Sequence, residues 1–576
     1  MDYKISVQNP LSHLVNIQIT TQTEGPKTFF VLPDWRPGRY ELANYAMNVR
    51  DVEVKSKKGE VFKLYKQNKN TWVVEASAGS DLNFSYNYYA CKMDAGNSWV
   101  DDSLIYINWT NCLMFVKGHE QRPSTLNFQL PDKYQVACSM QRQGDLFVAK
   151  DYYELADSPL LAAKRLDHWS YTLEGTEFHL WLHGCHNLKK EKVLEDFKAF
   201  TNVQMGLFGG FPAKEYHFIF LLLPYRHYHG VEHAGSTVIT LGPAEKVSTE
   251  LYQDFLHICS HELFHAWNVC RIKPKEFCPY DFSKETYFET GFMLEGITSY
   301  YGDLMLIRSG VISERNHLSM LSGSLQRHIN NLGHEHMSLT EASRDLWVDG
   351  YRTGAPCRTV SIYVKGALVV FLLDLTIRKH TNNTHSLDSL MLELWEKFGQ
   401  TGKGYTMNDL KNILKKLTNE EITEQFFNDH IYGTKLLEPE LSSLLGHIGC
   451  SLKKLRNINL REGIIGFLTK TENGKEVISC IAKGSPAEKH LATEDEVIEL
   501  TGLEDPNNPT VVVHVVRNGQ KKFVSIYKEE NKYFPVYHIE RLGDATTDQL
   551  KAFNLWTENG KALISGMYTR SEIVPA

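Results

Sequence analysis

Residues 260–268, SHELFHAWN, constrain the fold of this chain more than any other stretch. They place His261 and His265 four residues apart, with Glu262 directly after the first histidine. On a helix, side chains four residues apart lie on one face, so the two imidazoles can reach one metal ion. Glu262 is turned by about 100° from His261 and can reach a water on that ion without becoming a ligand. The alternative is a core helix in which two histidines happen to lie one turn apart.

A zinc site in an enzyme needs a third protein ligand, because catalytic zinc usually keeps three and leaves the fourth position to water. Glu295, in the stretch FMLEGITSYYGDL, is the candidate. The segment that leads to it contains Pro274 and Pro279, and we expect a helix, a loop and an antiparallel helix. Gly296 would allow a close helix approach, since it has no side chain. The alternative for Glu295 is a solvated helix glutamate.

Other histidines compete for the role of ligand. His257 lies one turn before His261 and stays an alternative ligand from the same helix face. A second group lies in the stretch RHYHGVEH and consists of His227, His229 and His233. For this group we expect positions at the edge of a cleft or on the surface.

The bulk properties exclude several classes of protein. The formal charge of −7 argues against nucleic acid as the main partner. The longest apolar runs, FIFLLL and ALVVFLL, are far shorter than the ~20 residues of a membrane span. The ten cysteines form no CxxC pair, so we expect free, mostly buried thiols. No secretory signal pattern begins the sequence, which predicts a cytoplasmic protein, with export left open because a signal peptide could have been removed.

The length of 576 residues predicts several domains. Alternating apolar runs separated by turn signals such as WRPGRY predict a sandwich-like β domain over residues 1–175. Mixed strands and then helical periodicity predict an α/β domain with a helical part over 176–440. Short strands return over 441–530, and 531–576 is expected to pack on the preceding domains as a tail. The fold class is therefore multidomain α+β.

Six stretches carry a resemblance to a known family. They are HELFHAWNVCRIKP, LEGITSYYGDL, LPDWRPGRYELANYAMNV, HGVEHAGST, SIYVKGALVVFLLDL and AKGSPAEKHLATEDEVIEL. Together they resemble the glycyl aminopeptidase family of gluzincin zinc metallopeptidases, which carry a PDZ domain after the catalytic domain. The resemblance implies a thermolysin-like catalytic domain, one Zn²⁺ ion and a PDZ-like domain over 441–530.

The resemblance also implies roles for individual residues. His261, His265 and Glu295 correspond to the zinc ligands, and Glu262 corresponds to the general base. Tyr363 corresponds to the tyrosine that donates to the oxyanion. The substrate-binding positions are Gly230 and Glu232, of which Glu232 receives the free α-ammonium group, and strand 236–240 is expected to pair with the substrate backbone.

Each of these roles has a simpler alternative. Tyr363 could be a core tyrosine at a helix start, and Glu232 could be a surface carboxylate. Three residues that follow the motif are expected to pack or to support the ligands: Trp267, Asn268 and Arg271. Arg271 is the one that could orient a carboxylate.

The chain also departs from the family pattern. His229 stands where related sequences usually have glycine, which could reshape the loop leading to Glu232. The PDZ-like stretch HLATEDEVIEL lacks the usual Gly-Asp before its Val-Ile strand, and EGIIGFL is not a clear peptide-binding loop. Peptide capture by this domain therefore stays open beside a role as a packed module or a lid.

The leading hypothesis is a zinc aminopeptidase that removes N-terminal residues from peptides, by metal-activated water with Glu262 as general base, with a preference for small residues such as Gly or Ala. One alternative is a zinc endopeptidase or a hydrolase of other amides. Another is a peptide-binding protein of the PDZ type with a vestigial peptidase body. The expected partners are peptides with a free N-terminus and a peptide ligand of the PDZ-like domain, without nucleic acid or a membrane span.

Overall fold

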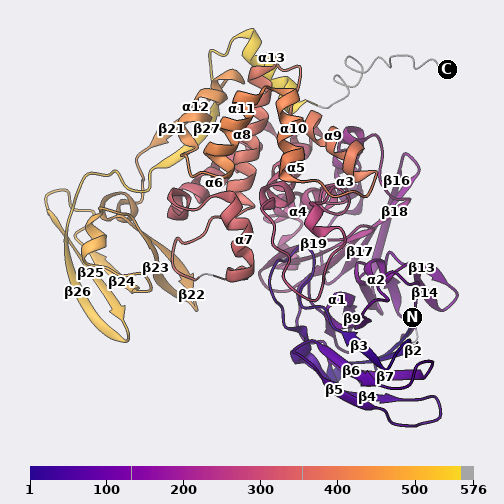
Figure 1. Cartoon of the computed structure of the whole chain (residues 1–576). Helices are drawn as coiled ribbons and strands as arrows, with labels where there is room; N and C mark the ends of the chain where they lie inside the picture. Colours follow the sequence, from indigo (N-terminus) through magenta and orange to yellow (C-terminus); the bar gives the residue numbers. More distant parts are fainter. Residues whose placement is uncertain (132, 353, 559–576) are drawn as a thin grey trace, which may run out of the picture.

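The computed structural model describes residues 1–131, 133–352 and 354–558. It has a multidomain α+β architecture. Figure 1 shows β-sheets of the N-terminal part in indigo and purple, a central body of helices, and a separate group of strands near the C-terminus on the opposite side. In the described part of the chain, no helix combines the length and the apolar character needed to cross a membrane.

Two sheets of the N-terminal part pack face to face. The larger has the order β13-β14-β11-β1-β2-β7-β4, and the smaller has the order β10-β3-β6-β5. Alternate residues of β2 (Leu14–Gln22) are buried, as the alternating sequence predicts. Phe30 and Phe84, from different sheets, stack with ring centroids 4.0 Å apart. The remaining strands are β1 (Asp2–Ser6), β3 (Lys27–Val31), β4 (Val49–Lys55), β5 (Lys63–Lys66), β6 (Thr71–Glu75), β7 (Asp81–Tyr89), β10 (Phe115–Val116), β11 (Ser124–Gln129), β13 (Gln141–Gln143) and β14 (Leu146–Ala149).

A third sheet joins the N-terminal part to the next one. Its order is β12-β15-β9-β8. Its buried side chains, among them Tyr106 and Leu161, share a core with Ile219 and Leu221 of the following sheet. Its strands are β8 (Trp99–Val100), β9 (Leu104–Ile107), β12 (Gln135–Ala137) and β15 (Leu160–Ala163).

The next sheet has the order β16-β17-β18-β20-β19 and supports the candidate site. Its strands are β16 (Asp167–Leu173), β17 (Thr176–His183), β18 (Glu215–Leu222), β19 (His227–Glu232) and β20 (Ser236–Gly242). β16, which precedes residue 175, pairs with β17 and so lies in this sheet. β20 pairs with β18 on one side and with β19 on the other. The expectation that strand 236–240 pairs with a substrate is therefore wrong, because both of its edges are occupied. β19 is the edge strand.

The central helices enclose the largest core of the molecule. The helices are α3 (Lys190–Phe208), α4 (Tyr252–Phe264), α5 (Ile297–Arg308), α6 (Glu314–Asn330), α7 (Leu339–Asp349), α8 (Val364–His380), α9 (Leu387–Leu394), α10 (Met407–Leu417), α11 (Glu420–Phe426) and α12 (Glu438–His447). A short π-helical turn, η5 (Phe292–Gly296), leads directly into α5. Helix α5 packs against both α4 and α8, so this part of the chain holds three helices at the site.

The strands β22–β26 form a five-stranded sheet, which we call the C-terminal module. They are β22 (Phe467–Glu472), β23 (Lys475–Ile481), β24 (Glu496–Thr501), β25 (Thr510–Arg517) and β26 (Gln520–Tyr527). Before β24, where the sequence has no Gly-Asp, Glu494 adopts φ 69°, the left-handed conformation that glycine favours. Asp495 then pairs with Arg517 at 2.6 Å.

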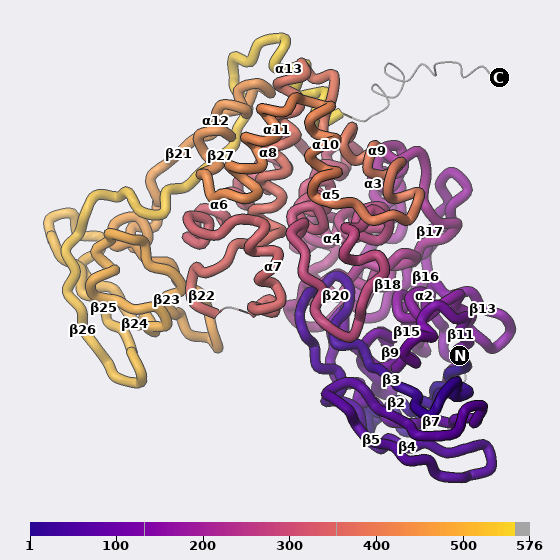
Figure 2. The backbone as a smooth tube through the Cα atoms, in the orientation of Figure 1, coloured from indigo at the N-terminus to yellow at the C-terminus, as the bar shows by residue number. Residues whose placement is uncertain are grey.

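The chain enters and leaves this module through a two-stranded ribbon of β21 (Cys450–Leu455) and β27 (Val536–Arg541) (Figure 2). It then returns to the central helices as α13 (Thr547–Thr557). There, Arg308 Nε donates to the carbonyl of Trp556 at 3.1 Å. Residues 559–576 of the predicted tail lie outside the described residues.

Candidate active site

The structure brings His261, His265 and Glu295 together. His261 lies in the last turn of α4 and His265 caps that helix. Their Nε2 atoms are 3.1 Å apart, and Glu295 Oε2 is 3.6 Å from the first and 3.5 Å from the second. Tetrahedral zinc with bonds of about 2.0–2.2 Å would hold its donors about 3.3–3.6 Å apart. Glu295 Oε2 is also buried without a hydrogen-bond partner. The three donors therefore fit a zinc ion.

Close helix packing fixes the carboxylate ligand. Glu295 lies in the π-helical turn η5, a type of turn that is frequent at functional sites. A β-carbon on Gly296 would lie 2.6 Å from the carbonyl carbon of Gly366 in α8. The close helix approach predicted at Gly296 is therefore present, but the helix that approaches is α8 and not the histidine helix α4. The approach to α4 occurs at Gly302, where a β-carbon would lie 3.1 Å from His261 Cα.

Asn268 ties the histidine helix to the turn that carries the carboxylate. Its Nδ2 donates to the carbonyls of Met293 at 2.8 Å and Leu294 at 3.1 Å, and to Thr298 Oγ1 at 2.9 Å. Its own carbonyl lies 3.2 Å from His265 Nδ1. A proton on Nδ1 donates to that carbonyl and leaves Nε2 free as a donor atom for a metal. Asn268 therefore supports the ligands, as expected.

Glu262 points to the side of the metal donors that faces the sheet. Thr237 Oγ1 donates to its Oε2 at 3.4 Å. On the neighbouring strand, a β-carbon on Gly230 would lie 2.5 Å from Glu262 Cδ, so this position accepts only glycine without a shift. Burial raises the pKa of Glu262 to about 8.

Glu232 ends the edge strand β19 and is buried, with no hydrogen-bond partner for Oε1. Oxygen atoms of Glu232 and Glu262 and a nitrogen of His265 all lie within 4.8 Å of one another. The turn formed by the WRPGRY stretch of the N-terminal part packs directly against the Glu232 side chain. Gly38, in this turn, has φ 74°, and a β-carbon there would lie 2.9 Å from Glu232 Cδ. Burial raises the pKa of Glu232.

Tyr363 is the N-cap residue of α8, which agrees with the expected helix start. Tyr351 and Tyr363 line a common cavity of about 440 Å³. The Tyr351 hydroxyl accepts a hydrogen bond from the backbone N–H of Tyr40 at 3.3 Å. Burial, and after it the Glu295 carboxylate, raises the pKa of Tyr363 well above its usual value, so this hydroxyl keeps its proton.

Three of the competing histidines, His257, His233 and His229, lie beside carboxylates outside the site. His257 is hydrogen-bonded to Asp303. His233 Nδ1 lies 2.9 Å from an oxygen of Asp157. His229, which replaces the usual glycine, is 3.7 Å from Asp94 of the N-terminal part. Burial lowers the pKa of His229 to about 3, so its ring is neutral.

The other residues after the motif also have structural partners. Trp267 is fully buried and stacks on Phe208 with centroids 4.9 Å apart. Arg271 donates to backbone carbonyls of Ala266, Pro212 and Ala234. The expectation that Arg271 could orient a carboxylate is therefore wrong, since backbone carbonyls take its hydrogen bonds.

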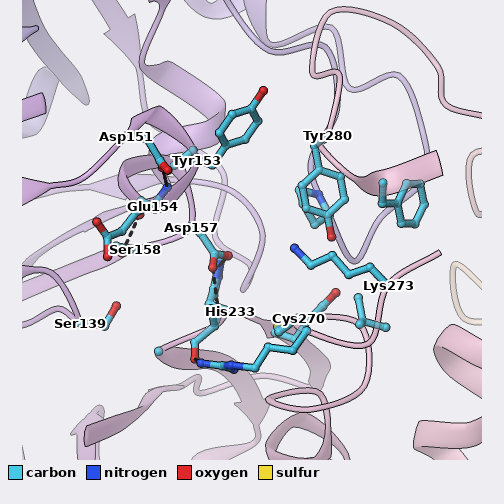
Figure 3. Close-up of a pocket in the computed structure, with 18 of the residues that line it drawn as sticks. Ser139, Asp151, Tyr153, Glu154, Asp157, Ser158, His233, Cys270, Lys273 and Tyr280 are labelled. Atoms are coloured by element: carbon cyan, nitrogen blue, oxygen red, sulfur yellow. Dashed lines mark hydrogen bonds and ion pairs between the residues drawn. The ribbon is translucent and has the colours of Figure 1, made fainter. Parts of the chain in front are cut away.

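A second cavity, of about 770 Å³, lies where the N-terminal part meets the sheet of the site, and Glu232 is in its wall. In Figure 3, Asp157 and His233 point toward one another on one side, and Lys273 and Tyr280 lie on the other. Lys273 Nζ is 4.6 Å from the centroid of the Tyr280 ring.

The sequence did not predict that residues of the N-terminal β domain contact the candidate site. Gly38 and Tyr40 lie in the stretch WRPGRY, which we interpreted only as a turn and as a match to the family. Gly38 contacts Glu232 and Tyr40 contacts Tyr351, and the members of both pairs are far apart in the sequence. The one available signal was the Pro-Gly pair, which predicts a turn but not its partner.

Comparisons with known proteins agree with the resemblance. Residues 2–164 match the Peptidase M61 N-terminal domain, and residues 254–369 match the M61 glycyl aminopeptidase domain. None of the curated proteins compared with the chain matches it.

Solved structures are also similar. An aminopeptidase N family protein from Idiomarina loihiensis is 25% identical, over 96% of this chain and 99% of that one, with a TM-score of 0.87. An M1 zinc metallopeptidase from Deinococcus radiodurans is 14% identical, over 76% of this chain and 94% of that one, with a TM-score of 0.46. The matched domains confirm the resemblance to the glycyl aminopeptidases: the chain is a peptidase that carries both M61 domains.

Proposed function

We propose that this peptidase is a zinc-dependent aminopeptidase, which hydrolyses the first peptide bond of peptides with a free N-terminus. The observation that carries the proposal is the position of two buried carboxylates beside one histidine. Glu262 and Glu232 both have an oxygen within 4.8 Å of a nitrogen of His265. One carboxylate is available for proton transfer and the other for a substrate cation.

One zinc ion would be held by His261, His265 and Glu295, whose donor atoms lie 3.1–3.6 Å from one another, close to the separations of a tetrahedral site. When bound, zinc lowers the pKa of a water from about 15.7 to about 7 and polarises the carbonyl that is attacked. The hydrogen bond between His265 Nδ1 and the Asn268 carbonyl fixes the tautomer that this binding requires.

Glu262 accepts the proton of the attacking water and delivers it to the leaving amine, a role that typically contributes about 10²–10⁴-fold. Its surroundings support this role, since Thr237 holds one oxygen and Gly230 leaves space beside the other. Tyr363 donates its hydroxyl proton in a hydrogen bond to the developing oxyanion. Its position at the start of α8, near the Glu295 carboxylate, supports this role.

Glu232 receives the α-ammonium group of the substrate. Its buried Oε1 lacks a partner, and a buried carboxylate without one is costly unless a cation or donor arrives. The turn at Gly38 closes the space directly beside this carboxylate. The edge strand β19, which carries Gly230 and Glu232, offers its backbone to the substrate, as extended peptides add to free sheet edges.

The proposed preference is for N-terminal Gly or Ala, and the description of the matched domain supports its glycine part. A series of peptides that differ only in the first residue, from Gly and Ala to Leu and Phe, tests it. We expect the highest kcat/KM for the small residues, and equal or higher values for Leu and Phe would contradict this preference.

We also propose that the C-terminal module is PDZ-like. Two features support this proposal: the five-stranded sheet, and the turn at Glu494 and Asp495 that precedes β24. A PDZ domain binds an extended peptide against a sheet edge. Within described residues 467–527, the only helical segment is the four-residue η10 (Pro486–Lys489). This supports a packed module more than a peptide-binding one.

Peptides with free and acetylated N-termini separate an aminopeptidase from an endopeptidase. We expect release of the first residue from free peptides, loss of activity after zinc chelation, and no cleavage of acetylated peptides. Undiminished cleavage of acetylated peptides would favour the endopeptidase. Absence of any cleavage by zinc-loaded protein would favour the non-catalytic alternative.

A further inference from the structure

Two cysteines from different parts of the fold meet at the C-terminal module. Cys480 lies on β23, whereas Cys357 lies in the connection between α7 and α8. Their Sγ atoms are 3.3 Å apart, although 123 positions separate them in the sequence. All ten cysteines are free thiols, and in the part of the chain that the structure describes this is the one contact between two of them.

The geometry of the contact is close to that of a bond. A disulfide has an S–S distance of about 2.05 Å, so the two sulfur atoms must approach by about 1.2 Å. Small rotations of two side chains supply such a movement. Leu332, Leu468 and Phe534 pack around the pair and hold both side chains at this position.

The surroundings make one of the two thiols the reactive one. The hydrogen bond from the Cys480 thiol is the largest cause that lowers the pKa of Cys357 to about 6; burial opposes it, and the backbone N–H of Leu332 adds to it. Cys357 is partly exposed, whereas Cys480 is buried. A low pKa together with access to solvent is the combination that makes a cysteine sensitive to oxidants.

We propose that Cys357 and Cys480 form a reversible disulfide when the protein meets hydrogen peroxide. The Cys357 thiolate attacks one peroxide oxygen, the O–O bond breaks, and Cys357 sulfenic acid and hydroxide form. The Cys480 sulfur then attacks the sulfenic sulfur, and the S–O bond breaks with loss of water. In sum, two thiols are oxidised to one disulfide and one peroxide is reduced to two waters. A dithiol reductant reverses the bond by thiol–disulfide exchange.

The bond would join two modules beside the candidate active site. Both cysteines line the cavity of about 440 Å³ whose wall also contains Tyr351 and Tyr363. A cross-link between distant residues restricts the unfolded chain and so stabilises the folded one. We therefore expect the oxidised protein to unfold at a higher temperature than the reduced protein.

Peptide mapping of the full chain tests this proposal. The protein is treated with hydrogen peroxide, free thiols are alkylated, and digestion follows without reductant. We expect a peptide that contains Cys357 linked to Cys480, lower in mass by two hydrogens than the separate peptides. We also expect a higher melting temperature, and dithiothreitol should reverse both changes.

Substitutions separate the specific bond from general oxidation. Cys357→Ala and Cys480→Ala should each abolish the linked peptide and the rise in melting temperature, and in Cys480→Ala the Cys357 sulfenic acid should be trapped by dimedone. Cys185→Ala, at an exposed cysteine, is the matched control and should behave like the parent. If Cys480→Ala does not fold, Cys357→Ala at the more exposed position carries the test. Both thiols still alkylated after peroxide, or the same stabilisation in Cys357→Ala, would overturn the proposal.

Discussion

The backbone of Gly230 lies directly against the carboxylate of Glu262, and a β-carbon at Gly230 would lie 2.5 Å from Glu262 Cδ. Gly230 is on the edge strand β19 and Glu262 is on the histidine helix α4. The contact therefore sets the distance between the surface proposed to bind substrate and the group proposed to move protons.

The substitution Gly230→Ala should displace the Glu262 side chain while leaving the metal donors in place. We expect kcat to fall by roughly 10²-fold, in line with the contribution of a general base, and the zinc content to stay at the parental value. Gly323→Ala, at a helix position where a β-carbon meets nothing within 4 Å, is the matched control. Full activity of Gly230→Ala would contradict the assigned position of Glu262.

The substitution Glu232→Gln should weaken binding of free N-termini. A hydrogen bond to a charged group contributes about 1.5–3 kcal/mol, so we expect kcat/KM for free peptides to fall by about 10- to 150-fold. Activity on acetylated peptides should stay at its low parental level. Equal kinetics of parent and variant on free peptides would remove Glu232 from the binding site.

The substitution Asn268→Ala removes the side-chain hydrogen bonds that join α4 to the turn of Glu295. Loss of groups that orient metal ligands typically costs about 10- to 100-fold in metal affinity, and we expect a weakening of this size for zinc. Competition with a zinc chelator measures it. Asn554→Ala, at an exposed asparagine of α13, provides the control, and equal affinities of the two variants would show that Asn268 does not orient the site.

The anchor of α13 predicts a pH dependence of stability. Arg308 Nη1 donates to both oxygens of Asp388 at 3.1 and 3.0 Å, and Tyr301 donates to Oδ1 at 2.7 Å. Burial opposes ionisation of Asp388, but Arg308, Arg378 and the hydrogen bond from Tyr301 together outweigh it and lower the pKa of this carboxyl. Because the folded state lowers this pKa, the stabilisation is fully present above the unfolded pKa of about 3.9 and is lost as the pH falls through the lower folded value.

Asp388→Asn should therefore lower the free energy of unfolding near pH 7 by about 3–5 kcal/mol, since it leaves Arg308 buried without its partner. The difference from the parent should shrink below pH ~4. Urea unfolding at several pH values measures both effects, with Asp145→Asn at a 99% exposed aspartate side chain as control. A difference that does not change with pH would contradict this role of the charge pair.

Local periodicity predicted the part of the site that is built from neighbouring turns. His261 and His265 lie together because helical spacing requires it, and Glu295 lies beside them because one helix returns along another. The close contact of Gly302 in α5 with His261 was not predicted, since nothing in the sequence states which faces of two helices meet.

Features that depend on pairing over long distances could not be predicted. Strand 236–240 was expected to bind substrate, but the order of strands in a sheet depends on partners far along the chain, and β19 takes the edge. Likewise, the turn at Gly38 reaches Glu232 across almost two hundred residues of sequence. Only the three-dimensional packing of two separate parts brings such groups together.

The most direct test of the account compares the parent with Glu262→Gln in one preparation, by zinc content and by release of the N-terminal residue from free peptides. We expect one zinc ion per chain in both proteins, and a loss of at least roughly 10²-fold in kcat for the variant, because the metal donors stay while the base is lost. A variant as active as the parent, or a parent without stoichiometric zinc, would contradict the account.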